Sequence, residues 1–357
     1  MPSTNKRRCT IVSFRFGPTD GVSVVARNWA DALSGMGFDV DWVAGDVEPG
    51  WADDRPLTLV EGLGIAAGPP PDPDALAAAL AGSDLVVVEN LCTIPLNPRA
   101  SAAVAGALRG RPAVMHHHDP PWQRDRFAHV TDLPPDDEGW LHVTINDLTR
   151  RQMAERGIAA TTIRNGFETD PPAGDRQSTR NRLGLPPDEL LVVHPVRAIP
   201  RKAVGRAVAI AEELGATYWL LGPAEDGYGP ELALQLAAAR CPVIHAPLAD
   251  RADIYAAADV VAFPSTWEGF GNPPVEASLA LRPVVVGRYP VADELRELGF
   301  SWFDADDLGP LRAWLGSPPE RRQSLLAADR AVAVRELSLD RMADRLESLL
   351  STAGWLP

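Results

Sequence analysis

Residues 263–276 read Phe-Pro-Ser-Thr-Trp-Glu-Gly-Phe-Gly-Asn-Pro-Pro-Val-Glu, and this stretch is the most informative part of the chain. It follows a hydrophobic strand pattern at 259–263 and leads into an Ala- and Leu-rich helical pattern at 275–281. A glycine-containing turn between a strand and a helix lets backbone N–H groups approach a ligand, and a helix N-terminus favours anionic groups. Glu268 in the turn and Glu276 at the start of the helical pattern could bind hydroxyls at two points of one polyhydroxylated ligand, such as a sugar nucleotide. A purely structural loop, with Glu276 complementing the helix dipole, is the alternative.

Strand and helix patterns alternate on both sides of this stretch. The expected strands lie at residues 9–14, 38–44, 84–89, 112–118, 140–145, 190–195, 217–221, 243–245, 260–263 and 283–287. The expected helices lie at residues 22–36, 74–81, 99–108, 146–156, 203–214, 231–239, 250–258, 275–281, 309–315 and 340–350. Because such alternation produces parallel sheets with right-handed crossovers, we predict an α/β protein with two Rossmann-like, doubly wound sheets facing across a cleft.

A polar, proline-rich stretch at residues 170–178 separates the two series of strands. We therefore expect an N-terminal domain at 1–172, a C-terminal domain at 173–335 and a last helix within 336–357 that packs back on the N-terminal domain. The length of 357 residues suits two domains of ordinary size.

Composition excludes several classes of protein. The net charge of −14 argues against a nucleic-acid partner, because binding to phosphates requires a basic surface. The three cysteines, Cys9, Cys92 and Cys241, show no metal or disulfide spacing. We find neither the pattern of a signal peptide nor an apolar stretch long enough to span a membrane, and we therefore expect a cytoplasmic protein without a transmembrane segment.

Two segments of the first half follow strand patterns. The turn Gly17-Pro-Thr-Asp-Gly21 could bring backbone groups to a ligand phosphate or to a second substrate, or it could be a tight connection. Met115-His-His-His-Asp119 ends a strand, and consecutive strand residues alternate between faces. Since the three histidines cannot converge on one ion, we predict no metal site. His118 is the best candidate for binding a sugar hydroxyl, and a capped strand end is the alternative.

A basic loop and an acidic loop in the second half can each be interpreted as functional or as structural. Arg197 and Lys202 follow the first strand and could grip two phosphates, or they could belong to a solvated loop. Asp304-Ala-Asp-Asp307 looks like a metal-binding motif, but its position favours a loop and helix cap.

Together these segments resemble the retaining glycosyltransferases of family 4, which have the two-domain GT-B fold. The similarity rests on residues 258–265, 268–271 and 276–277, on 144–157 with 163–166, on Arg197 and Lys202, and on His118. The sequence departs from the family pattern at Val196, Ala203, Asn146, Asn272, Pro273 and Arg282. These departures affect the expected shape of the donor pocket and leave every charged group in place.

The resemblance implies roles for individual residues. Glu268 would bind hydroxyls of the donor sugar, Glu276 the ribose, and Arg197 with Lys202 the departing diphosphate. His118 would contact the donor sugar. The remaining donor-binding residues would be Gly17, Gly21, Gly269, Phe270, Gly271 and Asn272. The family usually needs no divalent metal, so no cofactor is expected.

The expected activity is transfer of a hexose from a UDP- or GDP-linked sugar to a hydroxyl of a small, glycan or carrier-linked acceptor held by the N-terminal domain. A front-face displacement is favoured over Glu268 as a covalent nucleophile. A phosphorylase or a sugar-nucleotide epimerase on the same scaffold is one alternative. A non-catalytic protein that binds a nucleotide or a glycan is the other.

Overall fold

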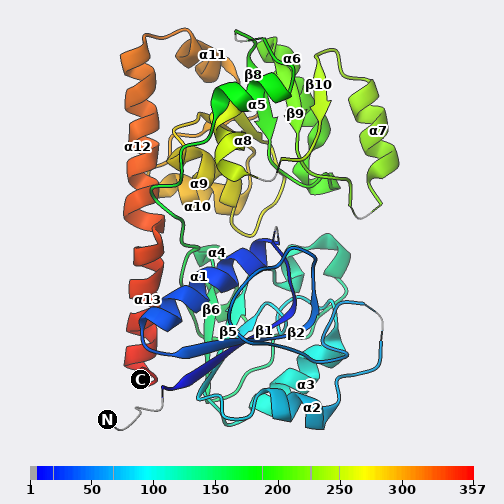
Figure 1. Ribbon diagram of the computed structural model, residues 1–357, viewed down its shortest axis with the longest axis vertical. Helices are drawn as coiled ribbons and strands as arrows, with labels where there is room; N and C mark the ends of the chain where they lie inside the picture. The colour runs from blue at the N-terminus through cyan, green and yellow to red at the C-terminus, as the bar shows by residue number, and fades with distance from the viewer. Residues whose placement is uncertain (1–5, 19, 67, 187, 226, 249) are drawn as a thin grey trace. The chain divides into compact units, whose positions relative to one another are not determined.

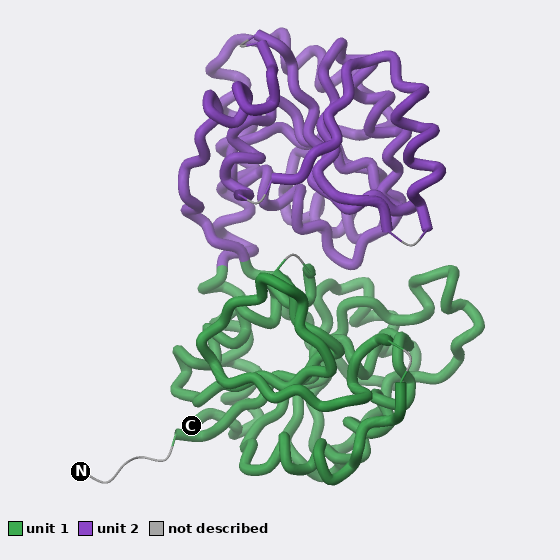
Figure 2. The backbone as a smooth tube through the Cα atoms, turned by 45° about the vertical axis from the view of Figure 1, so that its right-hand side comes forward, with its two compact units in different colours: residues 1–166, 339–357 green, residues 167–338 purple. Residues whose placement is uncertain are grey.

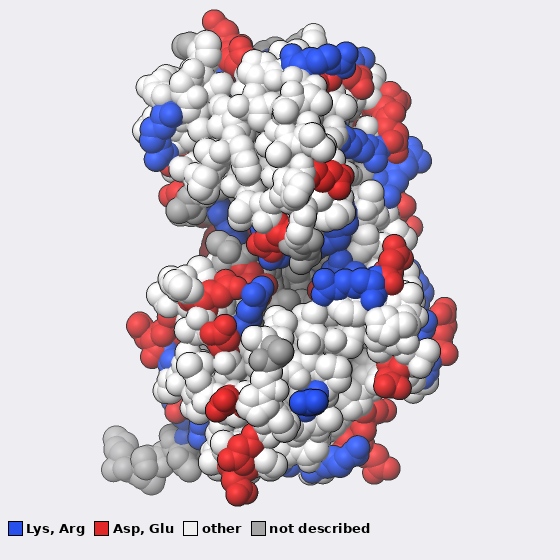
Figure 3. Space-filling model, turned by 90° about the vertical axis from the view of Figure 1, so that its right-hand side faces the viewer, with Lys and Arg blue, Asp and Glu red and all other residues white. Residues whose placement is uncertain are grey.

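The chain forms two compact units in the computed structural model, which describes residues 6–18, 20–66, 68–186, 188–225, 227–248 and 250–357. Unit 1 comprises residues 1–166 and 339–357, and unit 2 comprises residues 167–338 (Figure 2). The chain thus passes between units at 166–167 and 338–339, where the sequence predicted 172–173 and 335–336. No described helix is long and apolar enough to cross a membrane. On the face drawn in Figure 3, acidic and basic side chains are interspersed on both units.

Unit 1 is built on a parallel sheet with seven strands in its described part, in the order β3-β2-β1-β4-β5-β6-β7. The strands are β1 (Arg8–Phe16), β2 (Asp39–Val47), β3 (Leu57–Leu59), β4 (Leu85–Glu89), β5 (Ala113–His117), β6 (Trp140–Thr144) and β7 (Ala160–Thr162). The helices are α1 (Gly21–Gly35), α2 (Pro73–Ala79), α3 (Pro98–Leu108), α4 (Asp147–Ala154) and α13 (Leu339–Thr352), with short 3₁₀ turns at Pro121–Gln123 and Asp125–Phe127.

Both faces of this sheet are buried because helices cover each of them, and successive strand residues point to opposite faces. Ile11 packs with α1 and α13, whereas the next residue, Val12, packs with α2 and α3 (Figure 1). On α13, the three residues Met342, Leu346 and Leu350 recur every four positions and enter the same core cluster as α1. The last helix of the chain is therefore part of unit 1.

Unit 2 contains a parallel sheet with six described strands in the order β10-β9-β8-β11-β12-β13. The strands are β8 (Leu191–His194), β9 (Thr217–Leu220), β10 (Val243–His245), β11 (Val260–Phe263), β12 (Val284–Val286) and β13 (Phe303–Asp304). The helices are α5 (Arg176–Arg182), α6 (Val204–Leu214), α7 (Gly229–Ala237), α8 (Arg251–Ala257), α9 (Asn272–Leu279), α10 (Pro290–Glu297), α11 (Gly309–Leu315) and α12 (Pro319–Leu337), with a 3₁₀ turn, η3, at Pro200–Lys202.

The structure confirms the two parallel sheets and adds elements that the sequence patterns did not predict. These additional elements are β3, β7, β13, α5, α10 and α12. The missed strands have only two or three residues, which is too short to show alternation. Helix α12 has 19 residues, of which only Asp329, Val332, Ala333 and Leu337 are buried, so it lacks a continuous apolar stripe.

The order of the strands locates the functional edge of each sheet. In unit 1 the order reverses between β1 and β4, and in unit 2 it reverses between β8 and β11. Ligands of such open sheets bind outside the carboxyl ends of the strands at this switch point. The loops that leave β1, β4, β8 and β11 therefore lie at the edges where ligands would bind, as does the loop after β5.

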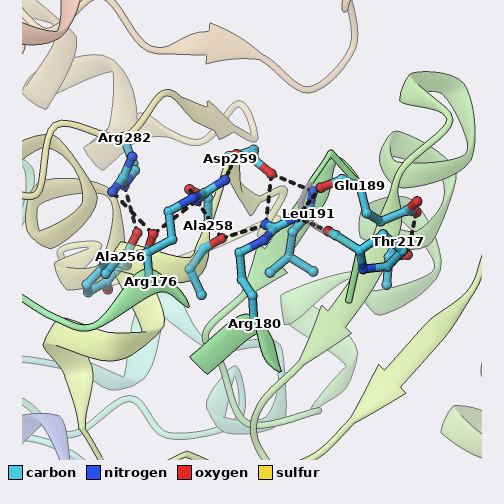
Figure 4. A network of polar contacts seen from close by, with 12 residues as sticks. Arg176, Arg180, Glu189, Leu191, Thr217, Ala256, Ala258, Asp259 and Arg282 are labelled. Atoms are coloured by element: carbon cyan, nitrogen blue, oxygen red, sulfur yellow. Dashed lines mark hydrogen bonds and ion pairs between the residues drawn. The ribbon is translucent and has the colours of Figure 1, made fainter. Parts of the chain in front are cut away.

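A polar network fastens helix α5 to the sheet of unit 2 (Figure 4). The Asp259 carboxylate, just before β11, accepts hydrogen bonds from Arg176 Nη2 at 2.5 Å, from Arg180 Nη1 at 3.2 Å and from the backbone N–H of Leu191 at 2.9 Å. Arg282 adds hydrogen bonds to the carbonyls of Tyr255 and Ala256 at the end of α8.

Replacing Asp259 by Ala should lower the free energy of unfolding by about 3 kcal/mol, because the almost fully buried Arg180 loses its counter-charge. Urea unfolding followed by tryptophan fluorescence measures this change. Asp293→Ala is the matched control, since its pair with Arg296 is exposed and should contribute less than about 1 kcal/mol. Equal losses in the two variants would contradict a special role for Asp259.

Candidate active site

A buried acid–base cluster lies beyond the carboxyl ends of β8 and β11 in unit 2. Glu268 accepts a hydrogen bond from Lys202 Nζ at 2.6 Å and forms an ion pair with Arg201, whose Nη1 also donates to the carbonyl of Trp267 at 3.0 Å. Lys202 Nζ lies 4.8 Å from the centre of the Phe263 ring. Glu268 and Lys202, predicted as site residues, are therefore in direct contact.

Burial and neighbouring charges have opposite effects on the pKa values of Glu268 and Lys202. Burial would raise the pKa of Glu268, but Lys202 and Arg201 lower it to about 2. Burial lowers the pKa of Lys202 to about 8, although the Glu268 carboxylate acts to raise it. At neutral pH the cluster holds two cations and one carboxylate, so a net positive charge remains. Such a site attracts an anion such as a diphosphate.

The backbone around Lys202 explains one departure from the family pattern. The turn η3 ends at Ala203, which adopts φ 51° and ψ 53°, in the left-handed region. This conformation costs a residue with a side chain about 1–2 kcal/mol and costs glycine nothing comparable. A glycine is common here in the resembling family, and the structure shows that the turn is retained despite the alanine.

Arg197 lies in the same loop but has a different partner. Its Nη1 donates to Glu225 at 2.8 Å, and both side chains are about two-fifths exposed. The positive charge of Arg197 is nevertheless close enough to contribute to the lowered pKa of Lys202. Arg201, which the sequence analysis did not single out, occupies the position next to Glu268.

Glu276 lies on α9, and its two oxygens have separate partners. Tyr255 Oη donates to Oε2 at 2.6 Å, and Arg251 Nη1 donates to Oε1 at 3.0 Å. The helix begins at Asn272 and not near residue 275, so the prediction that Glu276 opens the helix is wrong. Gly271, with φ 109°, is the N-cap of this helix, so Glu276 lies at its fifth residue. No contact between Glu268 and Glu276 is present among the described residues.

The turn 269–272 leaves no room for a side chain at Gly271. A Cβ on Gly271 would lie 2.9 Å from Tyr289 Oη, so a side chain would meet both a positive φ and a steric contact. Phe270 is buried, and its ring lies 6.1 Å from that of Phe167. Pro273 and Pro274 occupy the first turn of α9 and carry no N–H. These two prolines therefore contribute no backbone donor at this helix start.

In unit 1, His118 follows β5 and is almost completely buried. Its Nε2 lies 2.8 Å from Glu89 Oε2, and the same carboxylate contacts His116 Nδ1 at 3.0 Å. His117 points to the other face, where Thr93 and His142 contact its two ring nitrogens. The predicted alternation of the three histidines is confirmed, and Glu89 is their unpredicted partner.

Glu89, His116 and His118 also offer one ligand atom each within 4.8 Å of one another, as a metal site would. The separations of 2.8 and 3.0 Å are those of ordinary N–H···O hydrogen bonds. Both carboxylate oxygens are engaged in this way, so the geometry is satisfied by hydrogen bonds alone. The prediction of a metal-free site remains a prediction.

The two predicted glycines after β1 differ in their surroundings. The N–H of Gly17 donates to Ser23 Oγ at 3.0 Å, and a Cβ at Gly17 would overlap the Glu48 side chain. Gly21 opens α1 after the cap Asp20, with open space around its Cα. Thr19 lies outside the described residues. In unit 2, Asp307 Oδ1 accepts from the N–H of Gly309 just before α11, but the N-cap of this helix is Leu308 and has no side-chain cap, so the predicted helix cap within 304–307 is wrong.

The family of group 1 glycosyl transferases matches residues 198–304, which include Arg201, Lys202, Glu268 and Glu276. Mannosylglucosylglycerate synthase of Petrotoga mobilis is 24% identical over 365 residues, covering 81% of this chain and 84% of the relative. This chain is a glycosyltransferase with the GT-B fold.

Other relatives and solved structures agree with this GT-B assignment. D-inositol 3-phosphate glycosyltransferase of Xylanimonas cellulosilytica is 32% identical, over 55% of this chain and 50% of the relative. The structure of Anabaena Alr3699/HepE in complex with UDP-glucose has a TM-score of 0.73 at 19% identity, covering 96% of this chain and 99% of that one. Sucrose-phosphate synthase from Thermosynechococcus elongatus has a TM-score of 0.75 at 16% identity, covering 97% and 99%.

Three polar residues of this GT-B glycosyltransferase escaped the sequence analysis: Arg201, Glu89 and Asn90. Arg201 stands in the predicted basic loop, so its charge was a visible signal. Glu89 and Asn90 end an apolar strand, and a charged residue after four apolar ones at a switch-point strand was a signal of the same kind.

Proposed function

We propose that this glycosyltransferase is a retaining hexosyltransferase of family 4 that uses a UDP- or GDP-linked sugar. The cluster of Glu268, Lys202 and Arg201 carries the proposal. It presents two cations and one carboxylate at the carboxyl edge of the unit 2 sheet, where a nucleotide sugar would place its diphosphate and its sugar. Structures of a GT-B neighbour with UDP and with UDP-glucose support a uridine nucleotide as the first donor to test.

Each group in this site has a chemical task in the proposed reaction. Lys202 and Arg201 stabilise the charge that develops on the departing diphosphate, with Arg197 adding to the field. Glu268 holds the two cations and binds sugar hydroxyls. Glu276 binds the ribose, and residues 269–272 of unit 2 approach the sugar and phosphates. The cations perform the neutralisation that a divalent metal performs elsewhere, so we propose a metal-independent enzyme.

The names of the relatives narrow the class of acceptor. One relative is named for a mannosylglucosylglycerate and another for an inositol 3-phosphate. Glycerate carries a carboxylate and inositol 3-phosphate carries a phosphate ester, and both are small polyols. We propose a small, anionic, polyhydroxylated acceptor for this enzyme as well.

The function is tested by incubating the purified protein with UDP- and GDP-hexoses and with anionic sugar or polyol acceptors. Proton NMR of the product gives the anomeric configuration, which should equal that of the donor. Release of sugar 1-phosphate that depends on inorganic phosphate would indicate a phosphorylase, and interconversion of the donor sugar an epimerase. Nucleotide binding in a thermal-shift assay without any turnover would indicate a binding protein.

The pH dependence of kcat/KM should show a decline above pH 8. Lys202 has a pKa near 8 in the free enzyme, and its neutral form no longer stabilises the diphosphate. The guanidinium of Lys202→Arg stays charged at every pH of interest, so the decline should move upward by more than about one pH unit in this variant even if kcat falls. An unchanged alkaline limb in Lys202→Arg would assign the decline to another group.

Arg201→Ala should lower kcat more than Arg197→Ala does. Arg201 shares Glu268 with Lys202, whereas Arg197 is half-exposed and paired with Glu225. We expect a decrease of about 30- to 100-fold for Arg201→Ala, as for loss of one preorganised donor, and about tenfold or less for Arg197→Ala. Steady-state kinetics with saturating acceptor give both values. The reverse order would support the pair of Arg197 and Lys202 predicted from the sequence.

A further inference from the structure

The loop after β4 holds two buried polar residues, Glu89 and Asn90, that have no part in the proposed chemistry so far. Both contact His118, which directly follows the neighbouring strand β5. Glu89 is fully buried and its carboxylate faces two imidazole rings. Burial of a carboxylate is costly unless hydrogen bonds compensate it, and the two imidazole rings supply these hydrogen bonds.

The carboxylate of Glu89 is ionised. Burial would raise its pKa, but the interactions with His116 and His118 lower it to about 2. An ionised carboxylate only accepts hydrogen bonds, so both contacting imidazole nitrogens carry protons. These are Nδ1 of His116 and Nε2 of His118.

His116 and His118 differ in what their second ring nitrogens can reach. Nε2 of His116 is enclosed and has no hydrogen-bond partner among the described residues, and its ring stacks on Trp29 with centres 4.1 Å apart. Burial also lowers the pKa of His116. Nδ1 of His118 likewise lacks a partner within the described part of the chain, but it is not enclosed by protein atoms. Only His118 can offer its second nitrogen to a ligand.

The side chain of Asn90 holds the backbone at His118 in place. Its Oδ1 accepts hydrogen bonds from the N–H groups of His118 and Asp119, each at 3.2 Å. Asn90 itself has φ 57°, one of three positive values among the described residues other than glycine. Asparagine tolerates this conformation better than most residues, and such positions concentrate at functional sites.

We propose that Glu89 and Asn90 are positioning residues that set the tautomer and the orientation of His118. The Glu89 carboxylate fixes the proton on Nε2, and the Asn90 amide fixes the main chain. In the neutral ring, the tautomer with its proton on Nε2 would leave the lone pair of Nδ1 as a hydrogen-bond acceptor for a hydroxyl of the substrate. The part of this inference that concerns the substrate rests on the proposed function, whereas the tautomer is a property of the protein alone.

The tautomer can be measured without any substrate. Long-range proton–nitrogen NMR spectra distinguish the two neutral forms of histidine, and comparison with His118→Asn assigns the signals of His118. The wild-type protein should show the form protonated on Nε2. Glu89→Gln should show a mixture of forms, because an amide can donate as well as accept. The exposed Glu155→Gln should leave the spectrum unchanged. The form protonated on Nδ1 in the wild type would overturn the proposal.

Kinetic measurements then show whether Glu89 and Asn90 position His118 or only stabilise the fold. Glu89→Gln should lower kcat by about 10- to 100-fold with little change in the donor KM, as expected when a reacting group is misaligned. Asn90→Asp keeps the acceptor oxygen and should retain most of kcat. Asn90→Gly relieves the positive φ but loses the acceptor, so it should unfold at the same or a higher temperature and still lose about tenfold in kcat. Wild-type kcat in Asn90→Gly would contradict the role of Asn90.

A bound metal is the competing explanation for Glu89, His116 and His118. Elemental analysis of the purified protein should find less than one equivalent of any transition metal, and EDTA should leave the His118 signals unchanged. One equivalent of metal whose removal changes these signals would overturn the proposal. If the wild type turns over no sugar nucleotide, the proposed function fails, and the NMR result still decides the tautomer.

Discussion

Lys202→Ala should lower kcat by about 10²- to 10³-fold with a smaller change in the donor KM. A preorganised cation at the leaving diphosphate acts mainly in the transition state, where the negative charge on the phosphate oxygens is largest. Only 12% of the Lys202 side chain is exposed, so solvent cannot replace the missing charge effectively. Initial rates at saturating acceptor and varied donor measure the two constants.

Lys202→Met is the matched control for this experiment. It keeps most of the side-chain volume next to Phe263 and removes only the ammonium group. The losses of kcat in Lys202→Ala and Lys202→Met should be similar if the charge is what matters. A loss of less than threefold in both variants would rule out Lys202 as the group that stabilises the leaving diphosphate. Circular dichroism of each variant verifies that the fold is retained.

The positions of the site segments could be predicted because strand ends are visible in the sequence. Apolar stretches at 84–89, 190–195 and 260–263 end in polar or glycine-containing loops, and parallel strands place such loops at one edge of a sheet. Glu268 and Lys202 were found in this way. Their contact joins residues from two loops, and only the pairing of β8 with β11 brings these loops together.

Partners across strands could not be predicted in the same way. Glu89 and His116 are opposite each other in the register of β4 and β5, which no local pattern specifies. Local sequence patterns also cannot predict whether Arg197 or Arg201 pairs with Glu268. The pairing depends on the 3₁₀ turn that ends at Ala203, and an alanine in the left-handed region has no signal in the sequence.

Glu268→Ala should cause the second large effect, because it leaves Lys202 and Arg201 side by side without their carboxylate. We expect a loss of at least about 10²-fold in kcat and a loss of about 2–4 kcal/mol in the free energy of unfolding, since removing one partner leaves uncompensated buried charge. Urea unfolding and steady-state kinetics measure the two effects. An unchanged free energy of unfolding would mean that solvent hydrates Lys202 and Arg201 when the carboxylate is absent.

Glu268→Gln distinguishes the mechanisms that remain for Glu268. A side chain that orients sugar hydroxyls keeps a hydrogen-bond acceptor as glutamine, so kcat should fall by about 10- to 30-fold only, whereas loss of a covalent nucleophile typically costs about 10⁴-fold or more. The alkaline limb of kcat/KM gives an independent readout. The Glu268 charge raises the pKa of Lys202, so its removal should move this limb to lower pH. A moderate loss of kcat together with an acid shift supports the front-face reaction, in which Glu268 holds the donor and the cations but forms no bond to the sugar.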